Sequence, residues 1–245
     1  MRNVIAIARR ELLSYFSTPL AFVFIVIFLA LTGAFAFYLG DFFGSGQASL
    51  EAFFAYHPWL YLLLIPAISM RLWAEERKTG TIELLLTLPV STTQAVLGKF
   101  IAAWMFCGLA LFLTFPMWIS VNVLGHPDNG VIFASYLVSF FMAGAFLAIG
   151  SCISGLTSNQ VISFILAATA CFLFTMSGVE MVLNVFRLWA PEVLVQAVAS
   201  LSFLTHFNAV TKGVIDLRDL VFFGSVIVFW LLANVVVVDL KKSSA

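Results

Sequence analysis

The sequence predicts an all-α polytopic membrane protein with six transmembrane helices, on the strength of three observations. Hydrophobic residues make up 62% of the 245-residue chain and charged residues only 10%, whereas soluble domains are about half apolar and a quarter charged. Apolar runs of about 20 residues, the length that crosses a bilayer, recur along the chain. The charged residues gather in short segments between these runs. The pattern excludes a water-soluble globular domain, and the net charge of zero gives no sign of nucleic-acid binding.

The first segment, residues 1–18, has the spacing of an amphipathic helix. One face carries apolar side chains and the other carries three arginines: Ile5, Ala8, Leu12, Tyr15 and Phe16 against Arg2, Arg9 and Arg10. A helix of this kind lies in the membrane interface. Pro19 would end it, because the residue before a proline is biased away from helix. The alternative is a plain basic anchor that orients the first span.

Six apolar segments follow, and each is expected to cross the membrane: 20–40, 55–73, 96–123, 131–155, 160–183 and 219–239. The first is uncharged from Leu20 to Leu39, longer than a cleavable signal segment, so we expect it to be retained. Pro66 is expected to kink the second span. Residues 184–217 are too polar to cross and too apolar for a free loop. They are expected to form short re-entrant helices at an extracytoplasmic gate, or a lid on the membrane surface. The whole chain, 1–245, is one domain.

The Lys and Arg residues predict the orientation. Nine of them fall in the N-terminal segment, the loop between spans two and three and the C-terminus, and three fall on the opposite face. Positively charged loops stay on the cytoplasmic side. Both termini are therefore expected in the cytoplasm, with the chain in the cytoplasmic (inner) membrane of a bacterium.

The loop between spans two and three, residues 74–95, contains the most informative pattern. Glu83 would lie in the first turn of a short helix that begins after Gly80 and stops at Pro89. Ser91 and Gln94 have the spacing of a capping box, which would start the helix of span three. Several leucines crowd the short helix beside charged residues, which is typical of a docking element. The alternative is a tight loop that merely joins two spans.

In this position the loop resembles the signature of type 2 ABC-transporter permeases. The residues that carry the resemblance are Glu76, Gly80-Thr81, Glu83, Pro89-Val90-Ser91 and Gly98-Lys99. The segment from His206 to Leu220 resembles the branch of that family associated with gliding motility and nitrous-oxide-reductase maturation.

The resemblance implies an exporter subunit whose first cytoplasmic loop is a coupling helix that docks on a separate ATPase. ATP and Mg would be bound by two copies of that ATPase, and this chain would bind no cofactor and no metal. A second permease copy, identical or related, would complete the substrate path within the membrane lipid. The docking residues would be Glu76, Arg77, Lys78, Gly80, Thr81, Glu83, Leu84, Pro89 and Ser91. Gly98-Lys99 is not itself a phosphate loop, because Thr93 and Phe100 stand where that motif requires Gly and Ser or Thr, so the chain is not expected to be an enzyme.

The remaining features leave alternatives open. Glu180 and His206 are candidates for a gate or a substrate path. A stripe of small residues on span four indicates close helix packing, either within one subunit or at a dimer seam: Gly144, Ala148, Ser151 and Gly155. The competing function is a secondary transporter or channel without an ATPase partner, but such proteins carry more charge near the membrane midplane than these spans do.

Overall fold

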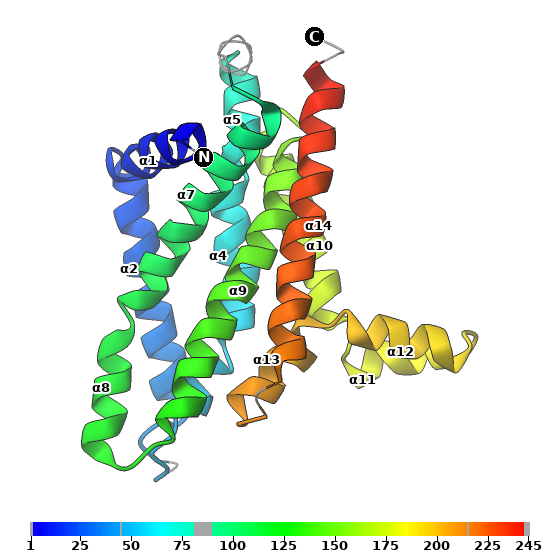
Figure 1. Cartoon of the computed structure of the whole chain (residues 1–245). Helices are drawn as coiled ribbons and strands as arrows, with labels where there is room; N and C mark the ends of the chain where they lie inside the picture. Colours follow the sequence, from blue (N-terminus) through cyan, green and yellow to red (C-terminus); the bar gives the residue numbers. More distant parts are fainter. Residues whose placement is uncertain (1, 45, 81–89, 215, 243–245) are drawn as a thin grey trace.

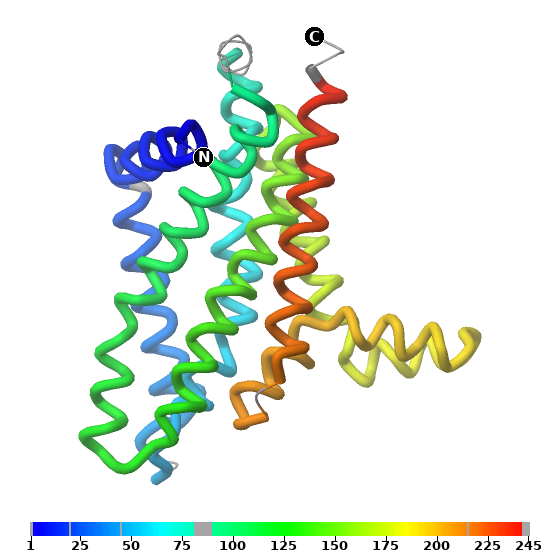
Figure 2. Tube along the Cα trace, in the orientation of Figure 1, coloured from blue at the N-terminus to red at the C-terminus, as the bar shows by residue number. Residues whose placement is uncertain are grey.

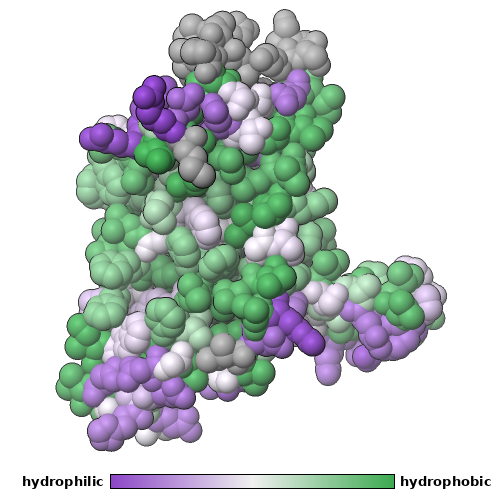
Figure 3. Space-filling model, viewed as in Figure 1, coloured by the Kyte–Doolittle hydropathy of each residue, from purple (hydrophilic) through white to green (hydrophobic). Residues whose placement is uncertain are grey.

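The computed structural model describes residues 2–44, 46–80, 90–214 and 216–242, and every regular element in them is helical. Five helical segments are long and apolar enough to cross a membrane, and up to seven cross if each of two bent helix pairs counts as one span. The expected six lies within this range. Both termini lie at the same end of the bundle (Figure 1); we call it the terminal end. Apolar residues cover the middle of the molecule, and hydrophilic residues gather at its two ends (Figure 3).

The chain begins with α1 (Arg2–Phe16), which lies across the terminal end of the bundle (Figure 1). Leu12, Tyr15 and Phe16 pack against the core, as the amphipathic spacing predicted. Ile5 does not join them, since it is 67% exposed. After an extended Thr18, Pro19 opens α2 (Pro19–Ala34), which continues as the π-helical segment η1 (Phe35–Leu39). Proline suits a first helical position because the helix needs no N–H there.

The second span is built from α3 (Glu51–Phe54), α4 (His57–Ser69) and α5 (Arg71–Thr79), which follow one another as a single candidate span. Pro66 lies inside α4, and the α-helix is interrupted at Met70. The expected loop at 74–95 is therefore helical in its first part, because α5 carries the second span on to Thr79. The Ser154 hydroxyl accepts from the Trp73 and Ala74 amides at 3.1 Å and donates to the Met70 carbonyl at 3.0 Å.

The third span comprises α7 (Thr92–Phe112) and α8 (Phe115–Leu124), and the fourth is α9 (Asn129–Ser154). Helix α9 is the centre of the bundle: every residue from Met142 to Ser154 is buried, and it contacts α4, α7, α10, α13 and α14. Its small residues let these neighbours approach. Gly144 meets Trp104 and Ile227, and Gly150 meets Ser69. The stripe therefore serves packing within one subunit.

The last third of the chain is broken into shorter helices. Helix α10 (Gln160–Met176) ends before the expected Leu183, and α11 (Glu180–Arg187) leaves it at 80°. Helices α12 (Glu192–Ser200) and α13 (Phe203–Thr211) are bent by 61°, and α14 (Leu217–Lys242) returns to the terminal end. Helices α11 and α12 project sideways from the bundle (Figure 2), which agrees with the short helices expected before the last span.

Candidate functional site

The predicted docking residues fall into two groups that flank an undescribed stretch. Glu76, Arg77 and Lys78 lie on the last turns of α5, and Gly80 ends that helix in the left-handed conformation with φ of 73°. Ser91 caps α7. The other four predicted docking residues lie outside the described residues, as does the expected coupling helix: Thr81, Glu83, Leu84 and Pro89.

A buried lysine joins the elements on either side of this stretch. Lys99, two turns into α7, has only 3% of its side chain exposed. Its Nζ lies 2.7 Å from Glu76 Oε1 on α5 and 3.4 Å from Glu11 Oε2 on α1. The Trp73 ring lies beneath the ammonium group, with its centroid 5.5 Å away. We call Glu11, Glu76 and Lys99 the lysine node.

Charge balance explains why this lysine can be buried. A buried ammonium group is stable only when it is paired, and here two carboxylates face it. Arg10 supplies the second positive charge, with Nη2 2.8 Å from Glu11 Oε1. Burial by itself would raise the pKa of Glu11, but the charges of Lys99 and Arg10 outweigh burial and hold that pKa below its ordinary value of 4.5.

Acidification should therefore release α1. A carboxyl whose pKa is lowered by folding stabilises the structure above its ordinary pKa, and this contribution is lost as the pH falls through the lowered value. We expect α1 to loosen only below pH 4.5. The measurement is the mobility of a spin label on a cysteine placed at exposed Leu13, since the native cysteines are buried. In Glu11→Gln, α1 should be mobile at neutral pH; an acid transition unchanged in that variant would contradict the assignment.

The glycine of the Gly-Lys motif, Gly98, has a packing role. A Cβ at this position would lie 2.7 Å from Ile7 Cγ2, 2.8 Å from Ile7 Cβ and 3.2 Å from the Val4 carbonyl oxygen. Glycine therefore lets α1 lie directly on α7. The two residues act together, because Gly98 brings α1 close and Lys99 then reaches the Glu11 carboxylate.

The start of α7 is also tied to its surroundings. Ser91 Oγ accepts from the Gln94 amide at 3.3 Å and Gln94 Oε1 accepts from the Ser91 amide at 3.4 Å, which is the predicted capping box. Gln94 Oε1 also accepts from Asn3 Nδ2 of α1 at 3.3 Å. Thr92 Oγ1 donates a hydrogen bond of 2.5 Å to Asp239 Oδ1, near the end of α14. Helices α1, α5 and α14 are thus each tied to α7 by side-chain contacts.

Sequence reasoning missed Glu11. The signal was present, because Glu11 is the only acidic residue before Asp41. It also shares the helix face of Ala8 and Tyr15, three residues before and four residues after it. An acid on the apolar face of a basic helix points to a buried cationic partner.

The two predicted gate residues have different surroundings. Glu180 is exposed at the first position of α11. His206 is held between two acceptors: Nδ1 lies 2.6 Å from Asp219 Oδ1, and Nε2 lies 3.0 Å from the Ser200 carbonyl oxygen. Its ring stacks on Phe222 at 4.0 Å. His206 therefore links α13 to the start of α14, a pairing with Asp219 that the sequence did not reveal.

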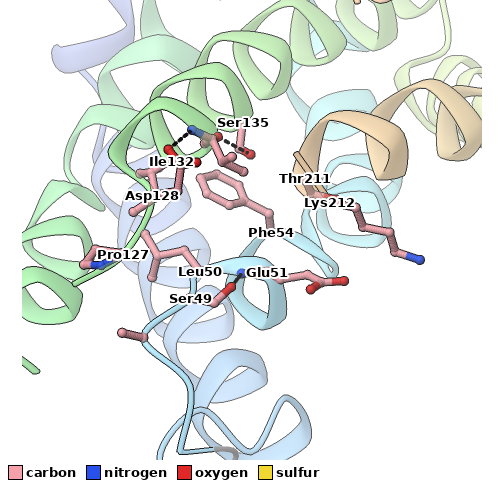
Figure 4. Close-up of a pocket in the computed structure, with 12 residues that line it drawn as sticks. Ser49, Leu50, Glu51, Phe54, Pro127, Asp128, Ile132, Ser135, Thr211 and Lys212 are labelled. Atoms are coloured by element: carbon pink, nitrogen blue, oxygen red, sulfur yellow. Dashed lines mark hydrogen bonds between the residues drawn. The ribbon is translucent and has the colours of Figure 1, made fainter. Parts of the chain in front are cut away.

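A pocket of about 210 Å³ lies at the end of the bundle opposite the termini, between the start of α3, the start of α9 and the end of α13 (Figure 4). Asp128 at its rim accepts from the Gly130 and Val131 amides at 2.9 and 3.2 Å, so this carboxylate caps α9. Glu51 and Lys212 extend toward one side of the pocket. The pocket marks where three segments meet.

These features define a class: a helical membrane protein in which a buried lysine joins two of the spans to a surface helix. The chain belongs to the ABC-2 family of transporter proteins, whose family model matches residues 5–239. It is therefore an ABC-2 type permease, which confirms the resemblance at the level of the family. The branch within the family stays a prediction.

Two curated relatives are both described as a probable multidrug ABC transporter permease, YbhS, from Escherichia coli K12 and from Escherichia coli O157:H7. Each is 33% identical to this chain over 100 residues, which is 41% of this chain and 26% of the relative. The chain thus spans about a quarter of the length of these relatives.

Proposed function

We propose that this chain is the membrane subunit of an ATP-driven exporter in which a separate ATPase subunit docks on residues 74–95. The observation that carries the proposal is the lysine node, because one buried cation joins α5, α7 and α1 at the two ends of that loop. A force applied to the loop therefore reaches three helices at once.

The contacts of α5 supply the route from the loop into the membrane. Helix α5 continues the second span, and its first amides are held by Ser154 of α9. Arg71 and Glu75 brace α5 by two hydrogen bonds, of 2.7 and 3.0 Å. Packed helices transmit displacement as rigid bodies. A shift of α5 would therefore move spans two and four together, while Lys99 passes the same shift to span three and to α1.

The ATP and Mg of this machine would belong to the partner. Lys99 is buried and engaged by two carboxylates, so its ammonium group is not available to a nucleotide phosphate. This chain would instead supply the docking surface, with Glu76, Arg77 and Lys78 at the end of α5 and Glu83 on the coupling helix. Opposite charges across such a surface steer association and fix its register.

The assembly would contain two permease subunits and two ATPase subunits in a bacterial inner membrane. The Lys and Arg distribution supports cytoplasmic termini, and the position of both termini at one end of the bundle agrees with it. The helices from α11 to α13, including Glu180 and His206, would then form the outer gate. The link between His206 and Asp219 would fix α13 against α14 in the closed state.

The decisive experiment tests partner dependence. The permease is purified with the ATPase encoded beside it, and ATP hydrolysis is measured in lipid vesicles. We expect Glu83→Ala to reduce hydrolysis to the rate of the ATPase alone while the permease still inserts normally. The matched control is Glu51→Ala, an acid at the opposite end of the bundle, which should keep full stimulation.

Two results would contradict the proposal. The first is a permease that binds no ATPase. The second is stimulation of hydrolysis that survives Glu83→Ala unchanged. Transport by the permease alone, without ATP, would instead favour a secondary transporter or channel.

A further inference from the structure

An apolar groove of about 580 Å³ runs between the third and fourth spans. One wall comes from α7 and α8, with Gly108, Phe112 and Phe115, and the other comes from α9, with Phe133, Tyr136 and Phe140. It opens outward from the bundle, because Phe112 and Phe133 are 67% and 60% exposed. Its volume falls in the range of roughly 300–1,000 Å³ that is typical of small-molecule sites.

A break in the third span sets one wall of the groove. Pro116 has no N–H for the Phe112 carbonyl, so α7 ends there and α8 restarts at Phe115. Thr114, in the break, donates to the Leu111 carbonyl at 2.6 Å. Tyr136 of α9 donates to the Thr114 carbonyl at 3.2 Å and lies 3.0 Å from its hydroxyl. The break is thus held by the facing helix.

Two tryptophans keep the floor of the groove rigid. Trp104 stacks on Phe140 with centroids 4.5 Å apart and planes 5° from parallel, and its Nε1 donates to the Phe140 carbonyl at 2.9 Å. Trp118 stacks on Tyr136 at 5.6 Å and 14°. A Cβ at Gly108 would lie 2.7 Å from the Phe140 ring. Glycine and fixed rings therefore preserve a concave surface that flexible side chains would fill.

The position of the groove identifies what fills it. Its walls belong to two candidate membrane spans, Thr92–Leu124 and Asn129–Ser154, so it faces the hydrocarbon of the bilayer. Membrane helices associate through small residues, whereas this groove is lined, apart from Gly108, by large aromatic and aliphatic side chains. We infer that the groove is a binding site for one acyl chain of a membrane phospholipid.

Polar side chains beyond one end of the groove suit the headgroup of that lipid. Trp118 Nε1 donates to Asn129 Oδ1 at 2.6 Å, and the side-chain amides of Asn122 and Asn129 exchange two hydrogen bonds of 3.0 Å. Tryptophan and polar amides at this level are typical of the membrane interface. Since this cluster lies where α8 turns into α9, away from the termini (Figure 1), the lipid belongs to the leaflet opposite the terminal end.

The site is independent of the proposed ATPase coupling, so the test uses the intact permease in its own membrane without nucleotide. A phosphatidylethanolamine with a photoreactive group in one acyl chain is incorporated and activated, and labelled peptides are located by mass spectrometry. We expect label to concentrate in 105–115 and 133–140. The comparison surface is the face of α14 around Val228 and Leu232, which are 58% and 62% exposed.

A groove-filling variant sharpens the test. Leu109 lines the groove and is 38% exposed, so Leu109→Trp should reduce groove labelling to the level of the α14 face. The matched control is Leu232→Trp on that face, which should leave groove labelling intact. Equal labelling of both surfaces in the unaltered protein would overturn the inference, even if Leu109→Trp failed to fold. Disulfide-linked dimers of Phe112→Cys would overturn it as well, because a second copy would then cover the groove.

Discussion

Replacing Lys99 by alanine is expected to lower the free energy of unfolding by about 3–5 kcal/mol, the cost of removing one partner from a buried ion pair. The change leaves Glu11 and Glu76, each with only 17% of its side chain exposed, with no cation between them. Their mutual repulsion should drive α1 off α7, so permease that still inserts should lose stimulation of the proposed ATPase partner. The measurements are the temperature at which the detergent-solubilised protein unfolds and the ATP hydrolysis of the assembled complex.

Two comparisons separate the node from a general effect of lost charge. Lys78→Ala removes an exposed lysine from α5 and should leave the unfolding temperature nearly unchanged. The triple variant Glu11→Gln, Glu76→Gln, Lys99→Met removes all three charges together. It should recover much of the lost stability, because a neutral replacement of a buried ion network is often well tolerated. If Lys99→Ala were as stable as Lys78→Ala, the node would not hold these helices together.

Replacing Gly150 by valine should have the second largest effect, because it forces apart the second and fourth spans. A Cβ at Gly150 would overlap Ser69 Oγ and lie 2.7 Å from Ser69 Cβ. Overpacking of this kind costs about 1–3 kcal/mol, occasionally more. The displaced α4 would also strain the hydrogen bonds that Ser154 makes to the start of α5. We expect a lower unfolding temperature together with weaker ATPase stimulation.

Gly224→Val is the matched control, since Gly224 lies in α14 and no atom beyond its own stretch of helix lies within 4 Å of the added Cβ. It changes helix propensity and side-chain volume as Gly150→Val does, but it creates no clash. The smaller change Gly150→Ala should be partly rescued by Ser69→Gly, which removes both atoms that the new methyl group meets. Equal losses in Gly150→Val and Gly224→Val would show that close packing at this crossing is unimportant.

Local patterns in the chain were enough to predict many individual features. The hydropathic runs identified a polytopic membrane protein, because burial in lipid demands long uninterrupted apolar helices. The break at Pro19, the capping box of Ser91 and Gln94, and the short helices before the last span depend on neighbours within a few residues. Such features can be derived from sequence since the atoms that cause them lie on the same stretch of backbone.

The candidate site was predicted only in part. Glu76 and Lys99 were identified by their resemblance to a family motif, but nothing local showed that they face each other. Glu11 was missed because its partner is far along the chain, and the pairing exists only when α1 crosses α7. The same reason hid the pairing of His206 with Asp219, in which α13 must lie against the start of α14.

The sequence by itself therefore determined that this protein is a membrane helical bundle of the permease type, with a charged loop between spans two and three. Only the tertiary structure decided what the Gly-Lys motif does: Gly98 admits α1, and Lys99 then ties it to α5. The physical reason is that helical periodicity tells which residues share a face but not which neighbour that face meets. That choice is made by close packing of whole helices, and here it joins a surface helix to the spans that frame the loop.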